Sequence, residues 1–419
     1  MIKMNYLNIY STIINNILQK NRNAYYLLKL GIFIGKNYVR LFPDKRLPKS
    51  LRYLHKIAFE WTYKGITSKR CVWVNLFAPA EILLAFNLDP IFVEAISAFL
   101  SGLELEDELI LRAESFGISE SFCSFHKVFI GAILSNLLKK PKFLVATSSI
   151  CDANLNTFRF ISESLKIPFF FLDIPREYSK EAKDYLKLQL KELISFVEKM
   201  TGSKLNLQKL SKVIEIENQV RSQMKECLKL LGKKQIPSTL TFEMFMLYTS
   251  HTFIGKEETL RFYKMLVEDL RNAKEKDKKG VFFIHTLPMF EENFKNLFNF
   301  NKDLTIIGMD LNYDFLEELP ADDPIEALSI KLLKNPYNSD FEKRIEHIKK
   351  LISLTSPYAV IQVCQMGCKQ SIGCSMLFKE EFKKLDIPFI FIDVDCVNKK
   401  NNNHGQIKTR LEAFFESIK

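Results

Sequence analysis

Cysteine is the residue type in this chain whose spacing most strongly suggests chemistry. The stretch "CQMGCKQSIGC" at residues 364–374 places three of the eight cysteines within eleven positions. Clustered thiols can form a disulfide, bind zinc, hold a redox cluster, or pack as small apolar side chains. The spacing C-x3-C-x5-C matches neither C-x2-C pairs nor a Cys/His alternation, and the six histidines are scattered. Zinc is therefore the weaker interpretation.

Two distant cysteines share one feature with Cys368: each follows an expected strand or begins an expected helix. Cys151 ends "PKFLVATSSIC", Cys368 ends "YAVIQVCQMGC", and Cys123 precedes the helical run "KVFIGAILSNLL". Helix N-termini and free backbone N–H groups stabilise thiolates and the sulfides of a cluster. Three thiolates on a cubane leave one iron open, which suits electron transfer or Lewis-acid chemistry on a substrate oxygen. Spacing alone is equally compatible with buried packing residues.

The remaining motifs are fewer. His126, three residues after Cys123, is interpreted as a helix-surface residue or a neighbour of the ligands rather than a ligand. Cys227, inside "RSQMKECLKLL", is interpreted as structural. The sequence has no G-x-x-x-x-G-K-[ST], no G-x-G-x-x-G and no G-x-S-x-G. We therefore expect no ATP hydrolysis by this chain, and electrons must come from another protein.

Apolar strands that alternate with helices must position these cysteines. The expected strands form two groups: "CVWVNLF", "PKFLVAT" and "IPFFFLDIP" in the first, and "GVFFIHTL", "LTIIGMDL", "YAVIQVC" and "IPFIFIDVD" in the second. This pattern predicts an α/β fold of two Rossmann-like lobes, each a doubly wound parallel sheet covered on both faces. Ligands bind at the carboxyl ends of such strands, where the cysteines are expected.

The same pattern divides the chain of 419 residues into four segments. We expect a basic helical N-terminal segment at 1–68 and a first α/β lobe at 69–205. A helical connecting segment at 206–277, with a turn at "KKQIPST", joins it to a second α/β lobe at 278–419. The chain is long enough for two domains with their own cores.

Charge is concentrated at the N-terminus. Residues 1–70 carry fourteen Lys or Arg and only two acids, a balance of +12 within a total of +11. This segment is either a solvated helical arm or a docking surface for an acidic partner, and no nucleic-acid motif accompanies it. No apolar run reaches the roughly 18 residues that span a bilayer, and no signal-peptide core is evident. We expect a cytoplasmic protein.

Several segments, in order along residues 70–419, resemble the 2-hydroxyacyl-CoA dehydratase and benzoyl-CoA reductase family. They are "APAEILLAFNLDPIFVE", "CSFHKVFIGAIL", "TSSICD", "FFFLDIPREYSKEAKDYLKLQLKELISFVEKMTG", "MGCKQSIG" and "DVDCVNKKNNNHGQIKTRLEAFFE". The most specific pieces are "GCKQ" and the closing "KTRLEAFFE". They look most like the substrate-handling, alpha-type subunit of the 2-hydroxyglutaryl-CoA dehydratase D-component type.

The resemblance implies a [4Fe-4S] cluster between the lobes, held by Cys123, Cys151 and Cys368. It also implies a dimer with a sister subunit or a second copy. A separate ATP-hydrolysing iron–sulfur activator would inject one low-potential electron. An acyl-CoA substrate would then form a ketyl radical, expel its hydroxyl group and leave as an enoyl-CoA, an anaerobic lyase reaction.

Glu81 matches the family's P-x-E acid, within Ala78-Pro79-Ala80-Glu81. The resemblance implies a role in proton transfer, and the alternative is a helix N-terminal carboxylate that complements the dipole. Two other functions stay open. Four surplus cysteines could complete a double-cubane [8Fe-9S] centre of an ATP-dependent reductase: Cys71, Cys364, Cys374 and Cys396. The chain could also be a non-catalytic subunit that relays electrons.

Overall fold

Two four-stranded parallel sheets organise the computed structural model, which describes residues 2–20, 22–275 and 277–418. The first sheet has the order β2-β1-β3-β4 and the second has the order β6-β5-β7-β8. The strands are β1 (Cys71–Val74), β2 (Asp89–Phe92), β3 (Leu144–Thr147), β4 (Phe169–Leu172), β5 (Lys279–Ile284), β6 (Leu304–Met309), β7 (Ala359–Gln365) and β8 (Phe389–Val394). The two lobes therefore share one topology, and the predicted α/β class is confirmed.

In each lobe the strand order reverses between two neighbouring strands, β1 and β3 in the first sheet and β5 and β7 in the second. The chain runs from β1 outward to β2 and then returns to the other side of β1 to form β3 and β4. Strands β5 to β8 repeat that path. In doubly wound folds this reversal opens a crevice at the carboxyl ends of the strands, where ligands bind.

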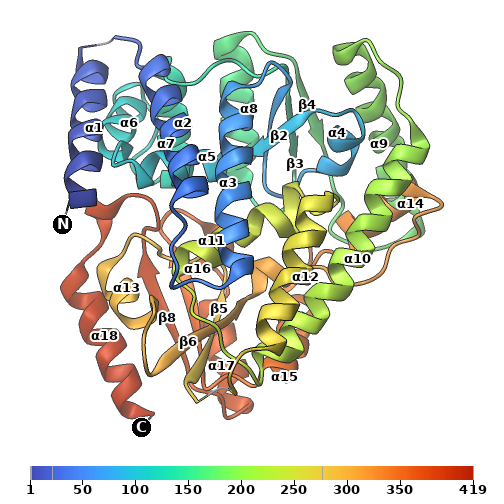
Figure 1. Ribbon diagram of the computed structural model, residues 1–419. Coiled ribbons are helices and arrows are strands. Elements are labelled where there is room, and N and C mark those ends of the chain that lie inside the picture. The colour runs from blue at the N-terminus through green and yellow to red at the C-terminus, as the bar shows by residue number, and fades with distance from the viewer. Residues whose placement is uncertain (1, 21, 276, 419) are drawn as a thin grey trace.

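Helices cover both sheets (Figure 1). The N-terminal segment and first lobe contain α1 (Ile2–Gln19), α2 (Tyr25–Leu41), α3 (Lys49–Thr67), α4 (Ala80–Ala85), α5 (Val93–Gly102), α6 (Glu106–Ser115), α7 (Ser124–Leu134), α8 (Asp152–Leu165) and α9 (Lys180–Thr201). The connecting segment contains α10 (Leu207–Leu231), α11 (Leu240–Leu247), the π-helical turn η1 (Tyr248–Thr252) and α12 (Glu257–Arg271). The second lobe contains α13 (Glu292–Phe298), η2 (Asp310–Tyr313), α14 (Pro324–Leu333), η3 (Pro336–Asn338), α15 (Phe341–Thr355), α16 (Lys369–Ile372), α17 (Ser375–Lys384), η4 (Lys399–Asn401) and α18 (His404–Ser417).

The connecting helices hold the two lobes together. Helix α10 contacts α4 of the first lobe and α14 and α15 of the second, and it packs along α12 (Figure 1). Its N-terminus is capped by Asn206, whose side chain accepts a hydrogen bond from the Lys209 amide. Such a cap satisfies one of the amides that a helix N-terminus leaves unpaired.

Helix α3 belongs to the core rather than to a solvated arm. Its apolar face packs against α2, α12, β1 and β2. Trp61 is 3% exposed, and its ring stacks on Phe253 of the connecting segment with centroids 4.2 Å apart. Helices α1 and α2 lie outside α3 and beside the first lobe (Figure 1). Within the described residues, the apolar stretch of every helix is too short to cross a bilayer.

Candidate functional site

Three helix N-termini carry the cysteines that the sequence singles out. Cys123 is the N-cap residue of α7, Cys151 of α8, and Cys368 of the single-turn helix α16. Cys151 follows β3 and Cys368 follows β7, which are the equivalent third strands of the two lobes. All three residues line one cavity of about 1140 Å³. The fold thus gathers thiols from both lobes at the crevice where a ligand is expected.

The electrostatics of these thiols show that they are near one another. Burial raises the pKa of Cys151 to about 12, an increase to which the Cys368 thiol contributes. Burial also raises the pKa of Cys123, and both other thiols add to that effect. Backbone amides in the first turns of α7 and α8 act in the opposite direction. Burial therefore disfavours the thiolate forms of Cys123 and Cys151, and a bound cationic centre would favour them.

A glycine allows Cys368 to approach Cys123 across the lobe boundary. Gly367 has φ +76°, and a β-carbon built on it would lie 2.9 Å from the Cys123 amide nitrogen and 2.9 Å from the Ser121 carbonyl oxygen. Residues with side chains are excluded from such a contact. The hydroxyl of Ser124 also donates to Asp395 Oδ2 at 2.5 Å, so the start of α7 is joined to the loop after β8.

Two buried imidazoles stand beside two of the thiols. His126 Nε2 lies 3.8 Å from Cys151 Sγ, and His285 Nε2 lies 3.8 Å from Cys368 Sγ. Burial lowers the pKa of His126 to about 4 and that of His285 to about 3. Both rings are therefore neutral at pH 7. His126 is a neighbour of the thiols, one of the two sequence interpretations, and it is not on the helix surface.

Strained backbone lies next to the same groups. Ile150, which precedes Cys151, has φ +64°, and His285 has φ +75°. Left-handed conformations are uncommon for residues other than glycine and cost about 1–3 kcal/mol each. Such strain concentrates at functional sites, where the surrounding structure enforces it.

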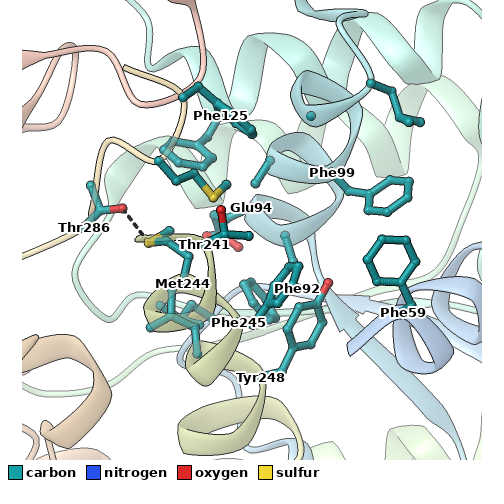
Figure 2. A pocket seen from close by; sticks show the side chains of 18 of the residues that line it. Phe59, Phe92, Glu94, Phe99, Phe125, Thr241, Met244, Phe245, Tyr248 and Thr286 are labelled. Carbon is teal, nitrogen blue, oxygen red and sulfur yellow. Dashed lines mark hydrogen bonds between the residues drawn. The ribbon is translucent and has the colours of Figure 1, made fainter. Parts of the chain in front are cut away.

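Glu94 is a cavity residue that sequence reasoning did not identify. It lies in the first turn of α5, and its Oε2 is buried without a hydrogen-bond partner. Burial raises the pKa of Glu94 to about 7, although the Asn154 side chain partly offsets this effect. In Figure 2 this carboxylate lies among the rings of Phe92, Phe125 and other aromatic residues. The signal that could have found it is a carboxylate directly after the short strand β2.

The predicted acid Glu81 lies elsewhere. Its side chain is 1% exposed and forms an ion pair with Lys331, which also contacts Glu217 Oε1 at 2.7 Å. Arg221 pairs with the same Glu217. Burial raises the pKa of Glu81, and Lys331 partly opposes that effect. Glu81, Arg221 and Lys331 line a small second cavity, so the structure does not bring Glu81 together with the three cysteines.

Four cysteines that could complete a double-cubane centre do not belong to the described lining of the cavity that contains Cys123, Cys151 and Cys368. They are Cys71, Cys364, Cys374 and Cys396. Cys71 Sγ donates to the Gly65 carbonyl at 2.5 Å, and Cys364 Sγ lies 3.2 Å from the Ser375 hydroxyl. Cys227 is fully buried within α10, as expected for a packing residue.

The three lining cysteines are a donor set that an iron–sulfur cluster can use. Among the residues that the structure describes, no group of three or more His, Cys, Asp or Glu side chains is arranged to hold one metal ion. In an iron–sulfur cluster each thiolate binds a different iron, so the sulfurs need not converge on one point. Three thiols around one cavity, with adjacent helix N-termini, suit that geometry.

Comparisons with known proteins agree on one family. The family model for 2-hydroxyglutaryl-CoA dehydratase, D-component, matches residues 75–418. The (R)-phenyllactyl-CoA dehydratase alpha subunit of Clostridium sporogenes is 21% identical over 401 residues, which cover 88% of this chain and 95% of that subunit. The (R)-2-hydroxyisocaproyl-CoA dehydratase alpha subunit of Clostridioides difficile is 26% identical over 50% of this chain and 53% of its own. A benzoyl-CoA reductase subunit of Thauera aromatica is 21% identical over 82% of this chain and 88% of its own.

Proposed function

This chain belongs to the 2-hydroxyglutaryl-CoA dehydratase D-component family, and we propose that it is the iron–sulfur subunit of a 2-hydroxyacyl-CoA dehydratase. One observation carries the proposal: Cys123, Cys151 and Cys368, from both lobes, line a single large cavity. A [4Fe-4S] cluster held by these three residues would supply reversible one-electron transfer and one iron without a protein ligand. The relatives are dehydratase and reductase subunits, which supports an enzyme component.

The proposed reaction is a redox-neutral elimination of water. The thioester carbonyl accepts one electron and becomes a ketyl radical, which expels the neighbouring hydroxyl group. The carbon on the far side of the one that carried the hydroxyl group then loses a proton, which combines with the expelled hydroxide to give water. The resulting radical anion gives up the electron that it accepted, and the product is an enoyl-CoA. Because no ATP-binding motif is present in the sequence, the electron would come from a separate ATP-hydrolysing activator protein.

The chain's own residues would position the acyl group and handle protons. The aromatic and aliphatic lining excludes water, which strengthens every electrostatic interaction inside. Glu94 has a pKa near 7, so its carboxyl group can both hold and release a proton at neutral pH. The catalytic role predicted for Glu81 stays a prediction, and its ion pairs support a role in joining α4 to α10 and α14.

The cavity also bears on the alternative functions. A relay subunit has no use for a cavity of about 1140 Å³ beside its cluster, so the volume favours a substrate site. The four surplus cysteines lie outside the lining, but the Cys368 thiol acts electrostatically on Cys364 and Cys396, so the double-cubane centre stays an alternative.

The test is reconstitution under strictly anaerobic conditions. The full chain would be combined with a sister subunit, or tested alone as a homodimer, and with an activating iron–sulfur ATPase. We expect ATP-dependent conversion of 2-hydroxyacyl-CoA thioesters, such as phenyllactyl-CoA, to enoyl-CoA products. An iron-containing chain that gives no product with any such thioester would contradict the proposal.

A further inference from the structure

We propose that the cavity binds an extended apolar acyl chain, with the thioester at the cysteines and the end of the chain between helices α1, α2 and α5. This inference rests on the proposed function and names its substrate class. The volume of about 1140 Å³ exceeds the roughly 300–1,000 Å³ of ordinary small-molecule pockets. The proposed cluster would occupy the part of this volume beside the cysteines, and the part lined by α1, α2 and α5 is left for the acyl chain.

The polarity of the lining is divided between the two ends. Most of the groups that can bond a polar substrate lie near the cysteines, namely Glu94, Asn154, His126, His285 and Gln365, and His55 of α3 is a further polar group of the lining. The far end is formed by α1 and α2, and the lining residues from these helices are Leu, Ile, Val, Gly and Tyr. Among the described residues of this strongly basic segment, no lysine or arginine belongs to the lining. A thioester suits the first end and a hydrocarbon the second.

Helix α2 presents one continuous face to the cavity. Leu27, Leu30, Ile34 and Tyr38 recur at helical spacing along it, and the last three are 53%, 57% and 41% exposed. The opposite face of the helix contains the buried residues of its packing side, such as Leu28. The far end therefore opens to solvent past apolar side chains, which is the environment that a chain of methylenes would cover.

Close packing by glycine fixes the position of this face. A β-carbon on Gly31 would overlap the Tyr10 hydroxyl, and one on Gly35 would lie 3.3 Å from the Phe59 ring. The Tyr10 hydroxyl already donates to the Leu27 carbonyl at 2.9 Å. The hydrogen-bond donor of the Tyr10 hydroxyl is thus already paired within the protein and needs no polar ligand.

Between the two ends, the wall has small residues facing aromatic ones. Ala95, Ala98 and Gly102 recur at helical spacing along one face of α5. Figure 2 shows the rings of Phe59 and Phe99 close together on one side of this space. Small residues leave the passage open, and the rings supply apolar surface on which a chain or ring can lie.

The same lining argues against the rival occupant, the pantetheine arm of coenzyme A. That arm carries two amides, and burying an amide without a hydrogen bond costs roughly 1–3 kcal/mol. Among the described residues, the side chains that α1 and α2 contribute to the lining include no amide, carboxylate, ammonium or guanidinium group. In contrast, residues beside the cysteines are exposed, including Ser121, Met366 and Lys369. The coenzyme A portion of the substrate can therefore extend from the thioester to solvent on the cysteine side.

This end of the cavity lies outside the family match. The family model begins at residue 75, whereas α1, α2 and α3 end at or before Thr67. The family model therefore does not cover the segment that lengthens the cavity. We infer that this segment sets the preference of this chain for acyl length.

The test is calorimetric titration of the anaerobically purified, iron-containing full chain with straight-chain thioesters from butyryl-CoA to dodecanoyl-CoA. If each added methylene is buried, affinity should rise by about two- to fourfold per carbon. Ile34→Trp narrows the mouth at an exposed site that folding tolerates, and we expect it to weaken dodecanoyl-CoA binding at least fivefold. The matched control is Ile13→Trp, because Ile13 is similarly exposed on α1 but does not line the cavity.

The outcomes separate this inference from the proposed function. Affinity that does not change with acyl length, on a chain that holds its iron, overturns the inference alone. Equal loss in Ile34→Trp and Ile13→Trp also overturns it, because that result indicates an effect of surface change such as a disturbed subunit contact. A chain without iron that still shows the length dependence contradicts the proposed function instead.

Discussion

Gly367 packs directly against Cys123: a β-carbon at residue 367 would stand 2.9 Å from the Cys123 amide nitrogen. The contact joins the two lobes at the point where their cysteines meet. Because Cys368 is the next residue, the absence of a side chain at 367 decides how closely the thiols from opposite lobes approach.

Gly367→Ala tests this contact. Alanine at φ +76° is strained by about 1 kcal/mol, and overlap with backbone atoms adds roughly 1–3 kcal/mol. We expect a lower free energy of unfolding, and iron release to a chelator at a given concentration should be roughly tenfold easier. The matched control is Gly202→Ala, at φ +72° with no atom within 4 Å of the new β-carbon. That variant should lose only the strain energy, and equal iron release in both would refute the role of the contact.

Glu94→Gln should flatten the dependence of stability on pH. Burial raises the folded-state pKa of Glu94 from 4.5 to about 7, so the folded protein binds this proton more tightly than the unfolded chain. In the wild type, unfolding free energy is therefore lost as pH rises from about 4.5 to about 7, by roughly 1–3 kcal/mol for this group. Chemical denaturation across that range, compared with the glutamine variant, measures the difference.

Glu243→Gln provides the control for a catalytic role of Glu94. Burial also raises the pKa of Glu243 to about 7, but Glu243 does not line the cavity. Both glutamine variants should flatten the stability profile, whereas only Glu94→Gln should reduce turnover with the activator. If the two variants turn over equally fast, Glu94 has no role in proton transfer.

Lys331→Met should destabilise the protein far more than a surface change on the same region. The substitution removes the cation that pairs with Glu81, and it leaves Arg221 as the remaining ion-pair partner of Glu217. The side chains of Glu81, Glu217 and Arg221 are all buried. Breaking a buried pair in this way costs roughly 3–5 kcal/mol. Lys334→Met removes an exposed ion pair with Glu317 and an exposed cation–π contact with Tyr178, each worth about 0–1 kcal/mol. Urea denaturation measures both.

Glu81→Gln then separates a structural from a catalytic role. The contacts of Glu81 predict lower stability with iron content retained and with turnover per folded molecule unchanged. Turnover lost at full stability would instead support the acid–base role that the family motif implies.

Most of the fold can be predicted from the sequence because fully buried parallel strands appear as apolar runs. Seven of the eight strands overlap such runs, for example β7 (Ala359–Gln365), which extends one residue beyond "YAVIQVC". Strand β2 is not predicted because its sequence, Asp-Pro-Ile-Phe, contains Pro90 and is no continuous apolar run. It lies at the sheet edge, where a proline removes no hydrogen bond from the sheet interior.

The candidate site was predicted only in part, and the reason is distance along the chain. The cysteines could be placed because each follows a strand or begins a helix, and parallel strands end at one edge. Glu94 was missed together with β2, the strand that positions it. The partner of Glu81 lies 250 residues away at Lys331, and helical periodicity cannot show that α2 borders the cavity. Such tertiary contacts leave no local signal.

The most direct test of the central claim is the iron and acid-labile sulfide content of anaerobically purified protein, measured for the wild type, Cys151→Ala and Cys227→Ala. We predict about four irons per chain for the wild type and for Cys227→Ala, whose thiol is buried in α10 away from the cavity. Cys151→Ala should lose most of its iron and the visible absorption of the thiolate–iron bonds. Full iron content in Cys151→Ala, or about eight irons per wild-type chain, would contradict a [4Fe-4S] cluster held by Cys123, Cys151 and Cys368.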